Sequence, residues 1–125
     1  SMIRLPAETL NRDERVRRVR DYMAHLPLRD YQAVIFGSVA RGDFIAESDT
    51  DLLIISDDLP LERGQRLDLL FNARDLAPEI EPVGWRRADW DRRWQEGDPF
   101  LRLLLQEGLW ITSETATALP GAEGK

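Results

Sequence analysis

The chain has 125 residues, of which 42% are hydrophobic and 32% charged, and its net charge is −6. That length fits one domain around one hydrophobic core. The chain has no cysteine and a single histidine, His25, which excludes disulfides, cysteine zinc sites and histidine metal clusters. Any metal site must therefore use oxygen ligands, the donors that Mg²⁺ and Mn²⁺ prefer.

The acidic balance argues against direct nucleic-acid binding, which needs a net basic face. No apolar run approaches the roughly 20 residues of a membrane helix, and no secretory signal is visible, so we expect a cytoplasmic protein. Arginines gather in two groups, Arg12, Arg15, Arg17, Arg18 and Arg20, and Arg86, Arg87, Arg92 and Arg93. They fit either solvated helix faces or a docking face for an acidic partner protein.

The first half of the chain predicts a helix, a strand and a short helix in that order. Asn11 can cap a helix whose apolar residues recur at helical spacing up to Leu26. Residues 31–36 form a short apolar run that reads as a buried strand ending at Gly37. Residues 38–41 should begin a short helix directly after that turn.

The second half predicts two more strands and three helices. Residues 51–56 read as a strand, and residues 61–77 as a helix with Leu67, Leu70 and Phe71 facing inward. Residues 80–85 form a third strand, which Pro82 assigns to a sheet edge. Two short helices follow, one capped by Asp89, and the other opened by Asp98-Pro99 with Phe100, Leu103 and Leu104 inward. Residues 109–111 can form a last strand. We expect one α/β domain over residues 1–111 and a mobile tail over 112–125.

Gly37 and Ser38 are the first candidate site residues. A glycine and a serine between a strand and a helix present backbone N–H groups and a hydroxyl to an anion, and the glycine permits close approach. Taken alone, such a pair also fits an ordinary turn with a helix cap.

Asp49 and Asp51 are the second candidate pair. Residues two apart on a strand point to the same face, with Cα atoms roughly 6–7 Å apart, so both carboxylates can bind one Mg²⁺. An exposed Asp-rich turn is the alternative. Against that alternative, Asp51 leads directly into an apolar strand, where two acids would repel each other unless a cation neutralised them.

The two pairs occur together in the stretch from Phe36 to Ile55, FGSVARGDFIAESDTDLLII. This stretch closely resembles the signature of the minimal nucleotidyltransferases, a branch of the DNA polymerase β-like superfamily. Residues 87–101 and 107–111 also resemble the carboxyl half of these small proteins, so the resemblance covers about residues 30–111. It implies a small mixed β-sheet flanked by helices, the polymerase β-like palm fold.

The resemblance also implies roles for individual residues. Gly37 and Ser38 would hold the β- and γ-phosphates of a nucleoside triphosphate, and Asp49 and Asp51 would coordinate Mg²⁺ (or Mn²⁺). Arg41 would touch the triphosphate or form an ion pair with Asp43 or Glu47. The family carries a third carboxylate on the next strand, where this chain offers Glu81, with Glu79 as the alternative.

The family resemblance implies Mg²⁺-dependent transfer of a nucleoside monophosphate, AMP from ATP, to a hydroxyl group. Minimal nucleotidyltransferases are typically paired with HEPN-domain toxins, so a HEPN-type partner protein and an antitoxin role are expected. At this length the chain has little room for an acceptor domain, so the partner would supply the hydroxyl. The alternative is a catalytically weak or inactive nucleotide-binding module that neutralises or tethers a partner protein through its Arg and Trp surfaces.

Overall fold

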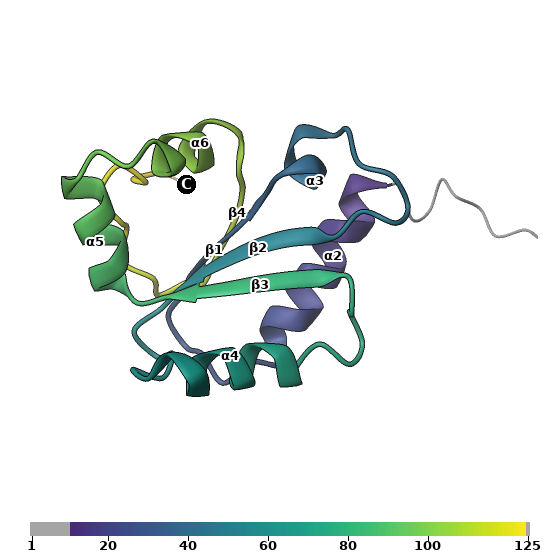
Figure 1. Ribbon diagram of the computed structural model, residues 1–125, viewed down its shortest axis with the longest axis horizontal. Coiled ribbons are helices and arrows are strands. Elements are labelled where there is room, and N and C mark those ends of the chain that lie inside the picture. Colours follow the sequence, from purple (N-terminus) through teal and green to yellow (C-terminus); the bar gives the residue numbers. More distant parts are fainter. Residues whose placement is uncertain (1–10, 125) are drawn as a thin grey trace, which may run out of the picture.

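A four-stranded mixed sheet lies at the centre of the computed structural model, which describes residues 11–124 (Figure 1). The strand order is β3-β2-β1-β4; β1 runs antiparallel to β2 and β4, and β2 runs parallel to β3. The elements are α2 (Arg12–Ala24), β1 (Gln32–Phe36), α3 (Ser38–Arg41), β2 (Thr50–Ile55), α4 (Arg63–Asn72), β3 (Ile80–Trp85), α5 (Arg87–Gln95), α6 (Pro99–Glu107) and β4 (Leu109–Thr112). This arrangement confirms the α/β architecture and the edge position predicted for Pro82.

Cap residues fix several helix boundaries. Asn11 and Asp98 each accept a hydrogen bond from the backbone N–H two residues later, at 2.7 and 3.0 Å, and Pro99 occupies the first turn of α6. Asp89 is not the cap of α5 that its position suggested. Because α5 already starts at Arg87, Asp89 lies in the first turn and accepts from the backbone N–H of Arg86 at 2.9 Å.

The two faces of the sheet carry separate cores. One face packs against α2 and α4, and its strand residues are Ala33, Ile35, Leu52, Ile54, Ile80 and Ile111. The opposite face packs against α5 and α6 through Val34, Leu53 and Ile55 (Figure 1). Since side chains alternate along a strand, Asp51 and Glu81 belong to the α5–α6 face.

Some apolar residues lie where the sequence pattern did not place them. α4 is shorter than expected, and Leu67 and Phe71 are 48% and 41% exposed, whereas Leu70 is buried as predicted. The inward position is occupied by Arg66, which donates to the carbonyls of Pro60, Leu61 and Gly84. In α6, Leu101 and Leu104 are fully buried and Phe100 is partly buried, but Leu103 is 40% exposed. A pattern of apolar letters cannot reveal a buried arginine that binds carbonyl groups.

The segment after Thr112 packs against the domain, in contrast to the mobile tail that we expected. Leu119 and Ala122 are buried in the core of the α5–α6 face. The indole of Trp90 donates to the Pro120 carbonyl at 2.9 Å, and Arg87 donates to two further carbonyls of the segment. The packing therefore continues beyond residue 111. Residues 1–10 of the expected domain and Lys125 of the expected tail lie outside the described residues. No helix within residues 11–124 is long and apolar enough to span a membrane.

Candidate active site

The turn at Gly37 lies directly against Asp51. β1 and β2 are paired so that Phe36 lies opposite Asp51, which brings the residue after β1 beside the start of β2. Gly37 has φ +75°, and a Cβ atom added to it would lie 2.4 Å from Asp51 Oδ2. Both the backbone conformation and the close approach therefore require glycine. The two halves of the predicted motif, 14 residues apart in sequence, meet at this contact.

Asp51 lies in a cluster of negative charge. It pairs in register with Glu81 on β3, and Asp49 lies just before β2. Partial burial raises the pKa of Asp51, and the charges of Asp49 and Glu81 raise it further; Arg41 is close enough to act in the opposite direction. The fold thus holds three carboxyl groups near one another at a cost that a bound cation would relieve.

Glu81 lies at the predicted position, but its carboxylate contacts the guanidinium group of Arg74. Its Oε1 is 3.5 Å from the Nη1 of Arg74, and its side chain is 45% exposed. Within residues 11–124, no three His, Asp or Glu side chains are close enough together to form a metal site. Asp49, Asp51 and Glu81 are therefore neighbours at one end of the sheet without forming a closed ligand set.

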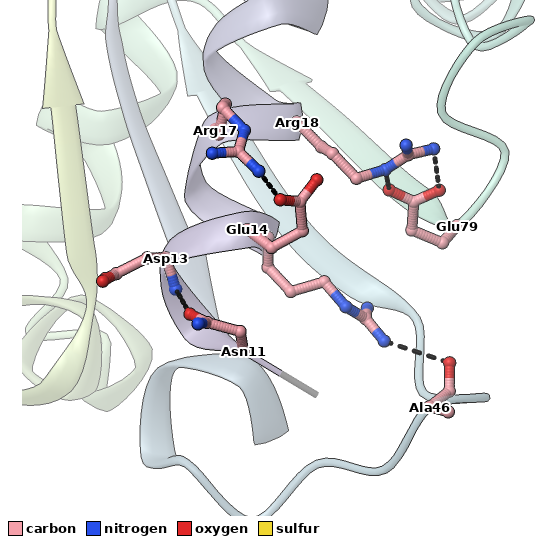
Figure 2. A pocket seen from close by; sticks show the side chains of 8 residues that line it. Asn11, Asp13, Glu14, Arg17, Arg18, Ala46 and Glu79 are labelled. Carbon is pink, nitrogen blue, oxygen red and sulfur yellow. Dashed lines mark hydrogen bonds and ion pairs between the residues drawn. The ribbon is translucent and has the colours of Figure 1, made fainter. Parts of the chain in front are cut away.

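Glu79, the alternative third carboxylate, is engaged elsewhere. It forms a two-pronged ion pair with Arg18, whose Nε and Nη2 donate to its two oxygens at 2.5 and 3.0 Å (Figure 2). Partial burial opposes ionisation of Glu79, but the hydrogen bond and charge of Arg18 outweigh it, and the pKa is lowered. Glu79 also lies one residue before β3 and outside its register pairs, whereas Glu81 pairs in register with Asp51. Glu81 is the better placed of the two.

Ser38, Arg41 and Ser48 have local roles that the geometry defines. Ser38 is the first residue of α3 and is partly exposed. Arg41 forms an exposed ion pair with Asp43 at 3.4 Å, one of the two pairings expected for it. Ser48 accepts a hydrogen bond from the Ile45 N–H at 3.0 Å, as a turn residue does.

Two arginines of α2 reach the motif, and sequence reasoning missed them. Arg12 donates to carbonyls of α3, and Arg15 donates to the loop before Asp49. Sequence reasoning assigned both to a solvated helix face or a docking face. Their spacing was the sequence signal that could have linked them, because residues three apart lie on the same side of a helix and can contact the same neighbouring segment.

Comparison with known proteins gives two findings. The sequence profile of the family described as "Nucleotidyltransferase domain" matches residues 16–87, more than half of the chain. A crystal structure of a candidate nucleotidyltransferase from Sulfolobus solfataricus is similar with a TM-score of 0.49 and 17% identity, covering 84% of this chain and 80% of that one. That likeness is too weak to support an argument about function. No curated protein matches the chain significantly.

The family match begins within α2, runs through β3 and includes Gly37, Ser38, Asp49, Asp51 and Glu81. It supports the superfamily that the sequence motif indicated. The chain belongs to the nucleotidyltransferase domain family and is a nucleotidyltransferase.

Proposed function

We propose that this chain transfers AMP from ATP to a hydroxyl group of a partner protein in a Mg²⁺-dependent reaction, as the antitoxin of a HEPN toxin pair. Family membership supports nucleotidyl transfer in general. One observation carries the site assignment: the Gly37 backbone lies against the Asp51 carboxylate, so a phosphate-binding turn and a carboxylate share one location. The AMP donor and the HEPN partner rest on the resemblance of residues 36–55 to minimal nucleotidyltransferases.

The donor atoms at this location suit Mg²⁺. Asp49 and Asp51 would hold the ion, and Glu81 would join them from the neighbouring strand. The raised pKa of Asp51 supports this, because burial and then the other carboxylates disfavour its charged form and a cation would favour it. When bound, Mg²⁺ would offset the negative charge of the triphosphate and of the transition state.

The side chains and backbone of the site would bind the phosphates and accept the proton. The backbone N–H groups and hydroxyl at Gly37 and Ser38 would bind the β- and γ-phosphates, with Arg41 contributing charge. Glu81 would accept the proton of the acceptor hydroxyl. The hydroxyl oxygen then forms a bond to the α-phosphorus while the bond to the bridging oxygen breaks, and pyrophosphate leaves on the side of Gly37 and Ser38.

The test is direct transfer to a candidate acceptor. The chain is incubated with labelled ATP, Mg²⁺ and the product of the neighbouring gene, and intact-mass spectrometry measures an added AMP. Asp49→Asn and Asp51→Asn serve as inactive controls. Undiminished transfer by both variants would contradict the site, and an unmodified neighbouring protein would contradict the proposed acceptor.

A second candidate is a module that binds a partner without turnover. The contact of Glu81 with Arg74 favours it, because it leaves the third carboxylate partly neutralised. A groove of about 370 Å³ along the β3 edge also favours it, being lined by the exposed Leu61, Leu67 and Val83 and by four arginines against one Asp89. Tight binding of an acidic partner protein by a chain that binds no ATP with Mg²⁺ in calorimetry would select this candidate.

A further inference from the structure

Two arginines on one side of α2 reach both halves of the active-site motif. Arg12 donates to the α3 carbonyls of Ala40 at 2.6 Å and Val39 at 3.3 Å. Arg15, one helical turn later, donates to the Ser48 carbonyl at 2.7 Å and the Thr50 hydroxyl at 2.8 Å. It also reaches the carbonyls of Ile45 and Ala46, at 3.3 and 3.2 Å.

These contacts suit a guanidinium group. Its five N–H donors lie in a rigid plane, so one side chain can serve several carbonyl groups at once. Arg15 is only 4% exposed, and its guanidinium also lies 5.1 Å from the Phe44 ring centroid. The loop between α3 and β2 has no helix or strand of its own, so side chains must satisfy and hold its backbone.

The anchored residues adjoin the proposed ligands directly. Val39 and Ala40 follow Ser38 in α3, and Ser48 and Thr50 flank Asp49. Holding both segments to a single helix fixes the distance between the phosphate-binding turn and the carboxylates. A misplacement of about 1 Å in such a site can cost about 10²-fold in rate.

We infer that Arg12 and Arg15 are positioning residues, which brace residues 39–50 against α2 so that Gly37-Ser38 and Asp49-Asp51 stay in register for one triphosphate and its metal ion. The inference rests on the proposed function for its ligand, but the brace itself is a property of the loop. Neither arginine needs to touch the substrate. This role replaces the docking face that their sequence pattern suggested.

The test uses the full-length chain with Arg12→Gln, Arg15→Gln and Arg15→Lys, and with Arg20→Gln as the control, since Arg20 is exposed on the same helix. Calorimetry measures ATP binding in the presence of Mg²⁺, and timed trypsin digestion measures cleavage after Arg41, where α3 ends and the loop begins. Thermal unfolding checks that each variant is folded. We expect Arg12→Gln and Arg15→Gln to bind at least tenfold more weakly and to be cleaved at least tenfold faster. Arg15→Lys should fall between them and the wild type, because lysine keeps the charge but loses the planar fork.

The two readouts separate the possible failures. Folded Arg12→Gln and Arg15→Lys chains that bind Mg²⁺ and ATP and resist trypsin like the wild type would overturn the brace, even if Arg15→Gln failed to fold. If the wild type bound no ATP, the proposed function would fail, and the trypsin rates would still decide the brace: faster cleavage supports it, and unchanged cleavage overturns it.

Discussion

Asp51 and Glu79 lie at the same end of the sheet, yet their electrostatic surroundings are opposite. Glu79 has a two-pronged arginine partner, which lowers its pKa. Asp51 has the carboxylates of Asp49 and Glu81 as neighbours, and burial and their charge raise its pKa. A carboxylate that has its partner within the fold serves stability. One that the fold leaves among like charges is available for an external cation.

Other acids follow the pattern of Glu79. The backbone N–H groups of Asp30 and Arg29 lower the pKa of Asp58, and the N–H of Arg86 with the charge of Arg92 outweighs burial to lower that of Asp89. Among residues 11–124, Asp51 is the one carboxyl group with a clearly raised pKa. The contrast between Asp51 and Glu79 therefore separates candidate chemistry from ordinary stabilisation.

The largest expected effect comes from removing the charge of the motif acids. Asp49→Asn and Asp51→Asn should each lower nucleotidyl transfer by about 10³-fold or more, as loss of a principal electrostatic contact does. The measurement is the initial rate of labelled AMP incorporation at saturating Mg²⁺. If Asp51→Asn transferred AMP within threefold of the wild-type rate, Asp51 would not be a catalytic residue and its contrast with Glu79 would be wrong.

Gly37→Ala tests the contact between the turn and Asp51. The added Cβ would lie 2.4 Å from Oδ2, so either the turn or the Asp51 carboxylate must shift, and we expect transfer to fall about 10²-fold. Gly97→Ala is the matched control, because Gly97 has a similar φ of +70° but open space around its Cβ position. Both variants should lose about 1–3 kcal/mol of stability to backbone strain, measured by urea unfolding. An equal loss of activity in both would contradict the contact.

Glu81→Gln and Glu79→Gln distinguish the two candidates for the third acid. If Glu81 takes the acceptor proton, Glu81→Gln should lower transfer by about 10²-fold, the low end for general base catalysis. Glu79→Gln should leave transfer nearly unchanged. The reverse order would move the third acid to Glu79 and reject the assignment from strand register.

Asp51→Asn and Glu79→Gln should change stability in opposite directions. Asp51→Asn should raise the free energy of unfolding at pH 7 by about 0.5–1 kcal/mol, since it removes like-charge repulsion at a functional site. Glu79→Gln should lower it by about 1 kcal/mol, a value kept small because its Arg18 partner is partly exposed. Urea unfolding at low ionic strength measures both. If both variants changed the free energy of unfolding in the same direction, the contrast between Asp51 and Glu79 would be wrong.

The stability contributions of Asp51 and Glu79 should also depend on pH in opposite directions. With its pKa raised above 3.8, Asp51 contributes stability that is present at low pH and lost as pH rises through that pKa. With its pKa lowered below 4.5, Glu79 contributes stability that is present above pH 4.5 and lost as pH falls through the lowered pKa. Unfolding curves from pH 3 to 7 should show Asp51→Asn gaining on the wild type as pH rises. Glu79→Gln should gain as pH falls.

The sequence predicted the parts of the fold that depend on local signals. Element order followed from apolar periodicity, and Asn11, Asp98 and Pro99 marked helix starts that the structure confirms. Leu67, Phe71 and Leu103 were misplaced because tertiary contacts decide which side of a short helix is buried. The segment carrying Leu119 was missed because its anchors, the Arg87 guanidinium and the Trp90 indole, bind backbone carbonyls that leave no sequence pattern.

For the site, the resemblance of residues 36–55 to the minimal nucleotidyltransferase signature predicted one shared location for Gly37 and Asp51, and the strand register pairs Glu81 with Asp51. The sequence could not show that Arg74 contacts Glu81 or that Arg15 is buried beneath the loop, because both depend on elements far apart in the chain. The Arg15 variants and the variants of the motif residues test these roles.

The most direct measurement of the contrast is calorimetric titration of ATP into the wild type, Asp51→Asn and Glu79→Gln, each with and without Mg²⁺. We predict that the wild type and Glu79→Gln bind ATP only when Mg²⁺ is present, and that Asp51→Asn binds at least tenfold more weakly than the wild type in the presence of Mg²⁺. Binding that is independent of Mg²⁺, or equal in Asp51→Asn and the wild type, would contradict the claim that Asp51 forms part of a cation-dependent nucleotide site.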